Sequence, residues 1–133
     1  MHLFIVNILQ VMDNCLLMNM DAARDDQLNL LIAEIKALMK GLDLFGKFHN
    51  EKDLPALEIA RDAIIFRAMN IQNRITSDHQ MTFPTAELIN LLNQPKFLEA
   101  NDALTKLHEI ADFPIASLHK FALSELLRSS LAE

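Results

Sequence analysis

Arg74 and His79 are the residues of this chain best suited to catalysis, because four residues separate a permanent cation from a proton carrier. An arginine at a helix end stabilises the charge of a phosphate, and a histidine gains or loses a proton near neutral pH. Arg67 and Asn70 precede Arg74 at helical spacings, so the three would share one face of a helix. Arg67, Asn70 and Arg74 therefore predict an anion-binding site.

The segment Arg74-Ile75-Thr76-Ser77-Asp78-His79 resembles the Arg-x4-His motif of the HEPN family of small α-helical ribonucleases. The resemblance implies an RNA-cleaving enzyme with Arg74 and His79 as its catalytic residues. The simpler interpretation, which we favour, is that Arg74 pairs with Asp78 at the end of a helix and that His79 lies in a loop. On that interpretation the chain has no catalytic residues.

The other candidate ligands are scattered. His108 and Asp112 are four residues apart and would face each other on a helix, but two ligands do not hold a structural metal. We interpret His108 as an exposed residue near a helix C-terminus, where the helix dipole favours a cation. With one cysteine, Cys15, and two glycines, the chain has no Cys-x-x-Cys pair and no glycine-rich phosphate loop. We expect no metal and no cofactor.

The composition predicts an all-α protein. The chain has 133 residues, with two glycines, four prolines and neither tyrosine nor tryptophan, so turn formers and strand formers are few. The net charge is −6, and the lysines and arginines are dispersed along the chain without forming a basic stripe. We therefore expect neither nucleic acid nor an anionic membrane as a partner. A lone cysteine fits a reducing compartment, and we expect a cytoplasmic protein.

Two long helices are predicted in the central part of the chain, about 23–45 and 53–76, and their matching lengths predict an antiparallel hairpin. Asp21, Asp25 and Asp26 offer a start to the first helix, Gly46 offers its end, and residues 47–52 are predicted to form a polar loop. The apolar positions that repeat at helical spacing are Leu28, Leu31, Ile35, Leu38, Leu42 and Phe45 in the first helix and Leu57, Ile64, Ala68, Ile71 and Ile75 in the second.

Prolines divide the C-terminal part into three predicted helices, about 85–93, 95–111 and 114–131. The pattern Phe-Pro-x-Ala-x-Leu at 83–88 recurs at 113–118, and Phe97-x-x-Ala100 resembles the aromatic-x-x-Ala signature of tetratricopeptide repeats. That resemblance implies a peptide-binding helical repeat. Our preferred interpretation is that Phe-Pro marks a helix entry, with proline fixing φ and phenylalanine packing on the core.

The first twenty residues carry one charged residue, Asp13, and are otherwise mostly apolar. We predict a helix over about 2–20 that is polar only along a stripe of Asn7, Gln10 and Asn14, which argues against a membrane span. We expect such a helix to lie in a core or between protomers, and contact with a membrane or lipid is the alternative. The predicted interface residues on one stripe of it are Leu9, Met12, Leu16 and Met20.

These observations predict one α-helical domain over residues 1–133, a bundle of five or six helices. A hydrophobic content of 51% and a mean hydropathy of +0.15 are high for a lone small domain, and self-association would cover the excess. We therefore expect a non-enzymatic protein-interaction module, a homodimeric adaptor, chaperone-like subunit or small regulator whose partner is itself or another protein. The alternatives are the HEPN-like ribonuclease and the tetratricopeptide-like peptide binder.

Overall fold

The computed structural model describes residues 2–75 and 82–132, and it describes side chains for 23–75 and 82–131. All regular structure in these residues is helical. There are four α-helices and one 3-10 turn: α1 (His2–Glu51), α2 (Leu54–Ile75), α3 (Thr85–Leu92), η1 (Phe97–Glu99) and α4 (Ala103–Ala132). The all-α prediction is confirmed. The predicted count of five or six helices is wrong for the described residues, because α1 and α4 each include residues that we assigned to two helices.

Helix α1 runs without a break through the two predicted helices 2–20 and 23–45 and through the predicted loop 47–52 as far as Glu51. Neither glycine nor proline stands between His2 and Lys40, so nothing in the backbone interrupts the helix there. Gly46, the predicted end, lies inside α1 near the side chain of Leu104. The helix ends instead before Lys52, whose positive φ of 56° is typical of a residue that follows a helix.

Helix α2 begins where the sequence predicts. The side chain of Asp53 accepts a hydrogen bond of 3.2 Å from the backbone N–H of Ala56, which caps the first turn, and Pro55 follows within that turn. Near the end of α1, the ring of His49 stacks on the ring of Phe45. The Nε2 of His49 lies 2.7 Å from the carbonyl oxygen of Ala100. This end of the molecule is therefore fixed to the segment that precedes α4.

The predicted apolar seams of α1 and α2 are confirmed. All six positions from Leu28 to Phe45 and all five from Leu57 to Ile75 that the helical spacing selects are buried. They form one core together with Leu88 and Leu92 of α3, Phe97 of η1 and the inner face of α4. The Oγ1 of Thr85 donates to the carbonyl oxygen of Ala68 at 3.2 Å and so attaches the start of α3 to α2.

Helix α4 contradicts the predicted break at residues 112–114, because it continues through Pro114. Its buried positions recur every three or four residues on both sides of the proline: Ala103, Leu107, Ala111, Ile115, Leu118 and Ala122. Packing of this continuous face on the core outweighs the local cost of an interior proline. The predicted helix 95–111 is also wrong at its start, since residues 97–99 form η1 and α4 begins at Ala103.

The two Phe-Pro segments have different structures. Phe83 is buried and lies just before α3, whereas Phe113 lies inside α4 with 80% of its surface exposed. The prediction that both mark helix entries is therefore confirmed only for the first. The stacked helix pairs of a tetratricopeptide arrangement are not formed over residues 82–132.

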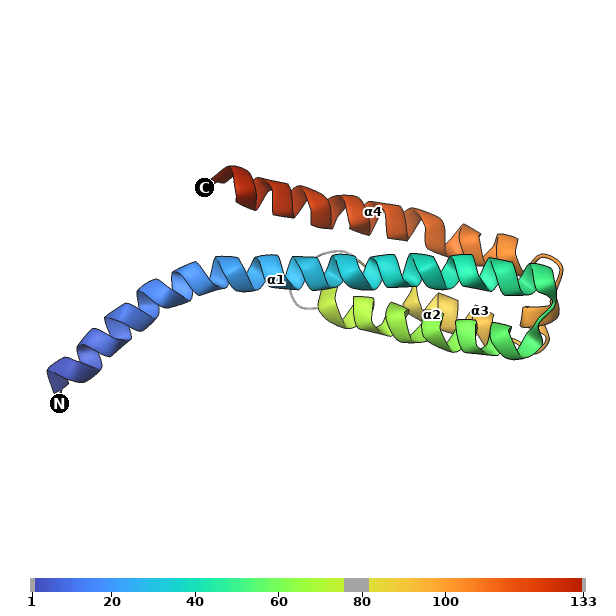
Figure 1. Ribbon diagram of the computed structural model, residues 1–133, viewed down its shortest axis with the longest axis horizontal. Helices are drawn as coiled ribbons and strands as arrows, with labels where there is room; N and C mark the ends of the chain where they lie inside the picture. Colours follow the sequence, from blue (N-terminus) through green and yellow to red (C-terminus); the bar gives the residue numbers. More distant parts are fainter. Residues whose placement is uncertain (1, 76–81, 133) are drawn as a thin grey trace.

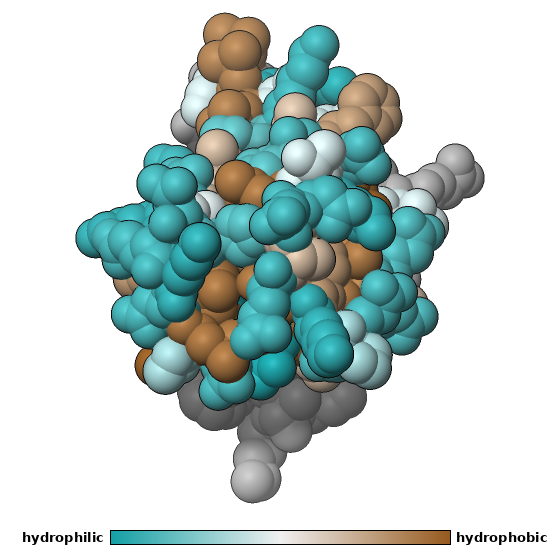
Figure 2. Space-filling view, turned by 90° about the vertical axis from the view of Figure 1, so that its right-hand side faces the viewer, coloured by the Kyte–Doolittle hydropathy of each residue, from teal (hydrophilic) through white to brown (hydrophobic). Residues whose placement is uncertain are grey.

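Figure 1 shows α1 between α4 and α2, with α3 behind α2, and α3 packs against both α2 and α4. Helix α1 extends beyond the other helices at its N-terminal end, where α4 also finishes. Figure 2 shows the opposite end of the bundle, which is largely hydrophilic, with apolar side chains visible between polar ones. Within the described part of the chain, no helix has a stretch that is both long and apolar enough to cross a bilayer.

Candidate functional site

The predicted anion-binding residues on α2 contact a carboxylate of the chain itself. Arg67 Nη1 donates to Oε2 of Glu34 at 3.0 Å, and Asn70 Nδ2 lies 3.4 Å from each of the two carboxylate oxygens. Glu34 belongs to α1 and is only 9% exposed, so these contacts provide the counterion and hydrogen bonds that a buried carboxylate needs. The predicted face exists, and Glu34 occupies the position of its anion.

Arg74 lies one turn further along α2. Its Nη1 donates to Oε1 of Gln27 at 3.4 Å, and its Nε is buried with no hydrogen-bond partner among the described residues. His79, the other half of the predicted catalytic pair, lies outside the described residues, as does Asp78. The pair of Arg74 and His79 therefore stays a prediction.

His108 and Asp112 face each other as their spacing predicts, with Nδ1 and Oδ1 2.7 Å apart. The reason we gave for His108 is wrong, however, because α4 does not end near it: His108 lies close to the start of a helix that continues to Ala132. In the described ranges no group of three or more His, Cys, Asp and Glu side chains is arranged to hold a metal ion.

The pair of His108 and Asp112 lies at one end of a groove between α1 and α4, which we call the α1–α4 groove. Its volume is about 580 Å³, and it extends along α4 from His108 to Leu127. Met39, Leu42 and Asp43 line it from α1. Most of its exposed lining surface is apolar, and its polar residues are Asp43, His108 and Asp112 at one end and His119, Lys120 and Ser124 further along α4.

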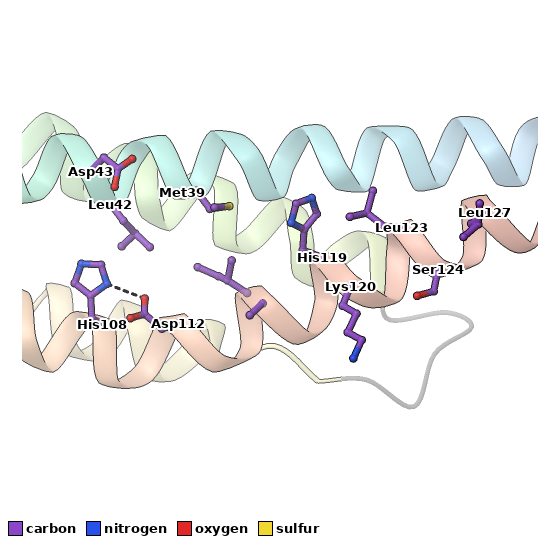
Figure 3. Close-up of a pocket in the computed structure, with 12 residues that line it drawn as sticks. Met39, Leu42, Asp43, His108, Asp112, His119, Lys120, Leu123, Ser124 and Leu127 are labelled. Atoms are coloured by element: carbon purple, nitrogen blue, oxygen red, sulfur yellow. Dashed lines mark hydrogen bonds and ion pairs between the residues drawn. The ribbon is translucent and has the colours of Figure 1, made fainter.

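Figure 3 shows how the side chains lie in this groove. His119 points from α4 toward α1, and its Nε2 is buried without a hydrogen-bond partner in the described part of the chain. Lys120 and Ser124 point away from α1, along the outer side of the groove. The groove therefore has a mostly apolar floor, interrupted by the ring of His119, and a polar outer edge on α4.

Three leucines of α4 continue the apolar lining toward its C-terminus. Leu123, Leu127 and Leu131 follow each other at intervals of four residues, and their exposed fractions rise from 48% to 61% and 78%. Residues four apart lie on the same side of a helix, so the three form a single stripe. The stripe begins in the groove and ends at the C-terminal end of α4, beside the end of the bundle that α1 passes (Figure 1).

Polar contacts hold α4 against α1 beside this stripe. Arg24 of α1 pairs with Glu125, which is 8% exposed, and Arg128 contacts the same carboxylate at 3.4 Å. Ser129 Oγ donates to Oδ2 of Asp25 at 3.3 Å. The two helices are thus joined both by the core and by this cluster, and the groove runs along the side of a supported helix pair.

The predicted interface residues Leu9, Met12, Leu16 and Met20 lie in the N-terminal part of α1, and their side chains fall outside those that the structure describes. The α1–α4 groove was not predicted from the sequence. The spacing of Leu123, Leu127 and Leu131 was the available signal, but the groove is assembled from two helices whose pairing no local pattern specifies. The predicted break at Pro114 also divided its α4 wall.

No family model, no curated protein and no solved structure matches this chain. The fold and the α1–α4 groove define a helical bundle with a mostly apolar groove along one helix pair.

Proposed function

We propose that this chain is a non-enzymatic protein-interaction module, acting as a homodimeric adaptor, chaperone-like subunit or small regulator in the cytoplasm. The observation that carries the proposal is the α1–α4 groove with its exposed leucine stripe. An apolar groove between two helices is a surface on which an amphipathic helix docks. Exposed apolar surface of this kind is costly in water unless a partner covers it.

Two further features support the proposal. The N-terminal part of α1 adds a strongly apolar segment at the same end of the molecule as the stripe (Figure 1). The polar contacts of Arg24 and Ser129 keep α1 and α4 together beside the groove, so the surface is formed before a partner arrives. A surface that is already ordered loses less conformational entropy on binding.

The experiment is light scattering after size exclusion for the wild type, Leu127→Asp and a matched control, Ile59→Asp. Ile59 is an apolar residue on α2 with an exposed fraction of 71%, comparable to the 61% of Leu127, and it is remote from the groove. We expect a wild-type mass of twice 15.1 kDa, a shift toward monomer for Leu127→Asp and no change for the control. A wild-type protein that is monomeric at every concentration would refute the proposal.

The ribonuclease alternative is tested separately by RNA cleavage with the wild type and with His79→Ala. Cleavage that disappears in His79→Ala would support a catalytic pair with Arg74. A wild-type protein that leaves RNA intact would exclude this alternative.

A further inference from the structure

We infer that the α1–α4 groove of one protomer receives the N-terminal segment of α1 from a second copy of the chain. This inference rests on the proposed homodimer and names the segment that forms it. The segment, residues 2–20, is called the arm below. Two features support the arm as the occupant, its length and its polarity, and the position of its one charged residue selects the register.

The arm has the length of the groove. Residues 2–20 of a helix span about 28 Å at 1.5 Å per residue, and the stretch of α4 from His108 to Leu127 spans about 30 Å. One helical arm therefore reaches from one end of the groove to the other. The arm also belongs to an α-helix whose backbone already continues beyond the rest of the bundle, past the end of α4 (Figure 1).

The arm has the polarity that the groove requires. On a helix its polar stripe of Asn7, Gln10 and Asn14 lies opposite the stripe that contains Leu9 and Leu16. When the leucines of the arm enter the groove, the amides remain in water.

A two-fold axis sets the direction of the arm in this contact. Helices α1 and α4 run antiparallel, and the arm leaves the bundle at the end where α4 finishes (Figure 1). A two-fold axis at that end places a second copy head to head with the first, so that its arm runs back along α4 in the same direction as α4. If Met20 of the arm lies beside Leu127, then Asp13 lies beside Lys120, because both pairs are seven residues apart.

The pairing of Asp13 with Lys120 provides charge complementarity. Asp13 is the one charged residue of the arm, counting Asp, Glu, Lys and Arg, and Lys120 is an exposed residue on the outer edge of the groove. Among the head-to-head registers, the one with Met20 beside Leu127 is favoured because it brings together the single acid of the arm and a base of the groove. The symmetry of the dimer makes this contact twice.

Charge reversal tests the register in the full-length chain. The variants are Asp13→Lys, Lys120→Asp and the two combined, with Lys36→Asp as a control because Lys36 is exposed and does not line the groove. Light scattering over a concentration series measures the dimer dissociation constant, and circular dichroism checks that each variant is folded. We expect each single reversal to weaken the dimer about tenfold, because each dimer loses two pairs and gains two like-charge contacts. The dissociation constant of the double variant should return to within about threefold of the wild-type value, and Lys36→Asp should leave the wild-type dissociation constant unchanged.

The outcomes separate this inference from the proposed function. A dimer that is insensitive to Lys120→Asp, or a double variant that is no stronger than the single ones, would refute arm docking in this register and leave the homodimer in place. A dimer in which the two arms pair with each other would also be insensitive to Lys120→Asp, because that contact does not involve Lys120. A monomeric wild type would refute both. A second test, Met12→Asp, should weaken the dimer as strongly as Leu127→Asp, and an unaffected dimer would count against the arm.

Discussion

The contact between Arg67 and Glu34 should contribute measurably to stability, and replacing Arg67 by methionine tests it. Methionine keeps most of the length of the side chain and removes the guanidinium. Among the described residues, Glu34, which is 9% exposed, would retain the two longer contacts of 3.4 Å from Asn70. A buried carboxylate that loses its cation loses the interaction that offsets its burial, which destabilises the folded state.

The size of the effect follows from the exposure of the arginine. Loss of one partner from a fully buried pair costs about 3–5 kcal/mol, and loss of a hydrogen bond to a charged group costs about 1.5–3 kcal/mol. The side chain of Arg67 is 39% exposed, so water would partly replace it, and we expect a loss near the lower range, about 2 kcal/mol. For a chain of 133 residues this corresponds to a fall in Tm of about 7 °C.

Thermal and urea unfolding followed by circular dichroism, at one fixed protein concentration, measure this loss. The control is Arg61→Met, because Arg61 pairs with Asp62, whose side chain is 70% exposed, and such surface pairs contribute at most about 1 kcal/mol. The double variant Arg67→Met with Glu34→Met removes the buried charge, so it should recover most of the lost stability. A loss below about 0.5 kcal/mol for Arg67→Met, or a double variant no more stable than the single one, would show that the contact is not the buried ion pair described above.

Two further predictions concern residues that interrupt helical propensity inside α1 and α4. Gly46→Ala should raise the free energy of unfolding in urea by about 0.5–1 kcal/mol, because a Cβ there would meet Leu104 at an ordinary contact distance of 3.4 Å. Gly41→Ala should give no such increase, because a Cβ there would lie only 3.2 Å from the side chain of Ile64. Equal effects at the two glycines would contradict the packing around Gly41. Pro114→Ala should stabilise the protein by about 1–3 kcal/mol in the same assay, because it restores a backbone donor inside a continuous helix. A loss of stability would mean that the packing of α4 depends on the proline.

The apolar seams of α1 and α2 were predictable from the sequence because they depend on local periodicity. Leu28 to Phe45 and Leu57 to Ile75 repeat at the helical period, and that period selects the buried face whatever the partner helix is. The same applies to the start of α2, where Asp53 and Pro55 act within a single turn. The all-helical class follows from composition for the same reason, since each residue contributes its own propensity.

The helix boundaries that failed depend on contacts between distant segments. Local rules place an end at Gly46 and a break at Pro114, but Leu104 packs near the glycine, and the buried residues Ala111 and Ile115 continue the core on both sides of the proline. Packing of a continuous apolar face outweighs a local preference of a few kcal/mol. Helix propensity therefore identified the segments as helical without identifying where each helix ends.

The candidate site depends on tertiary structure more strongly than the fold does. Periodicity placed Arg67 and Asn70 on one face of a helix, but it could not reveal that Glu34, more than thirty residues earlier, supplies their anion. The α1–α4 groove likewise needs Met39 and Leu127 to lie along one helix pair. Residue types and spacing specify which side of a helix is apolar, whereas the pairing of helices is a property of the whole chain, and it determines which apolar surfaces become core and which remain open to a partner.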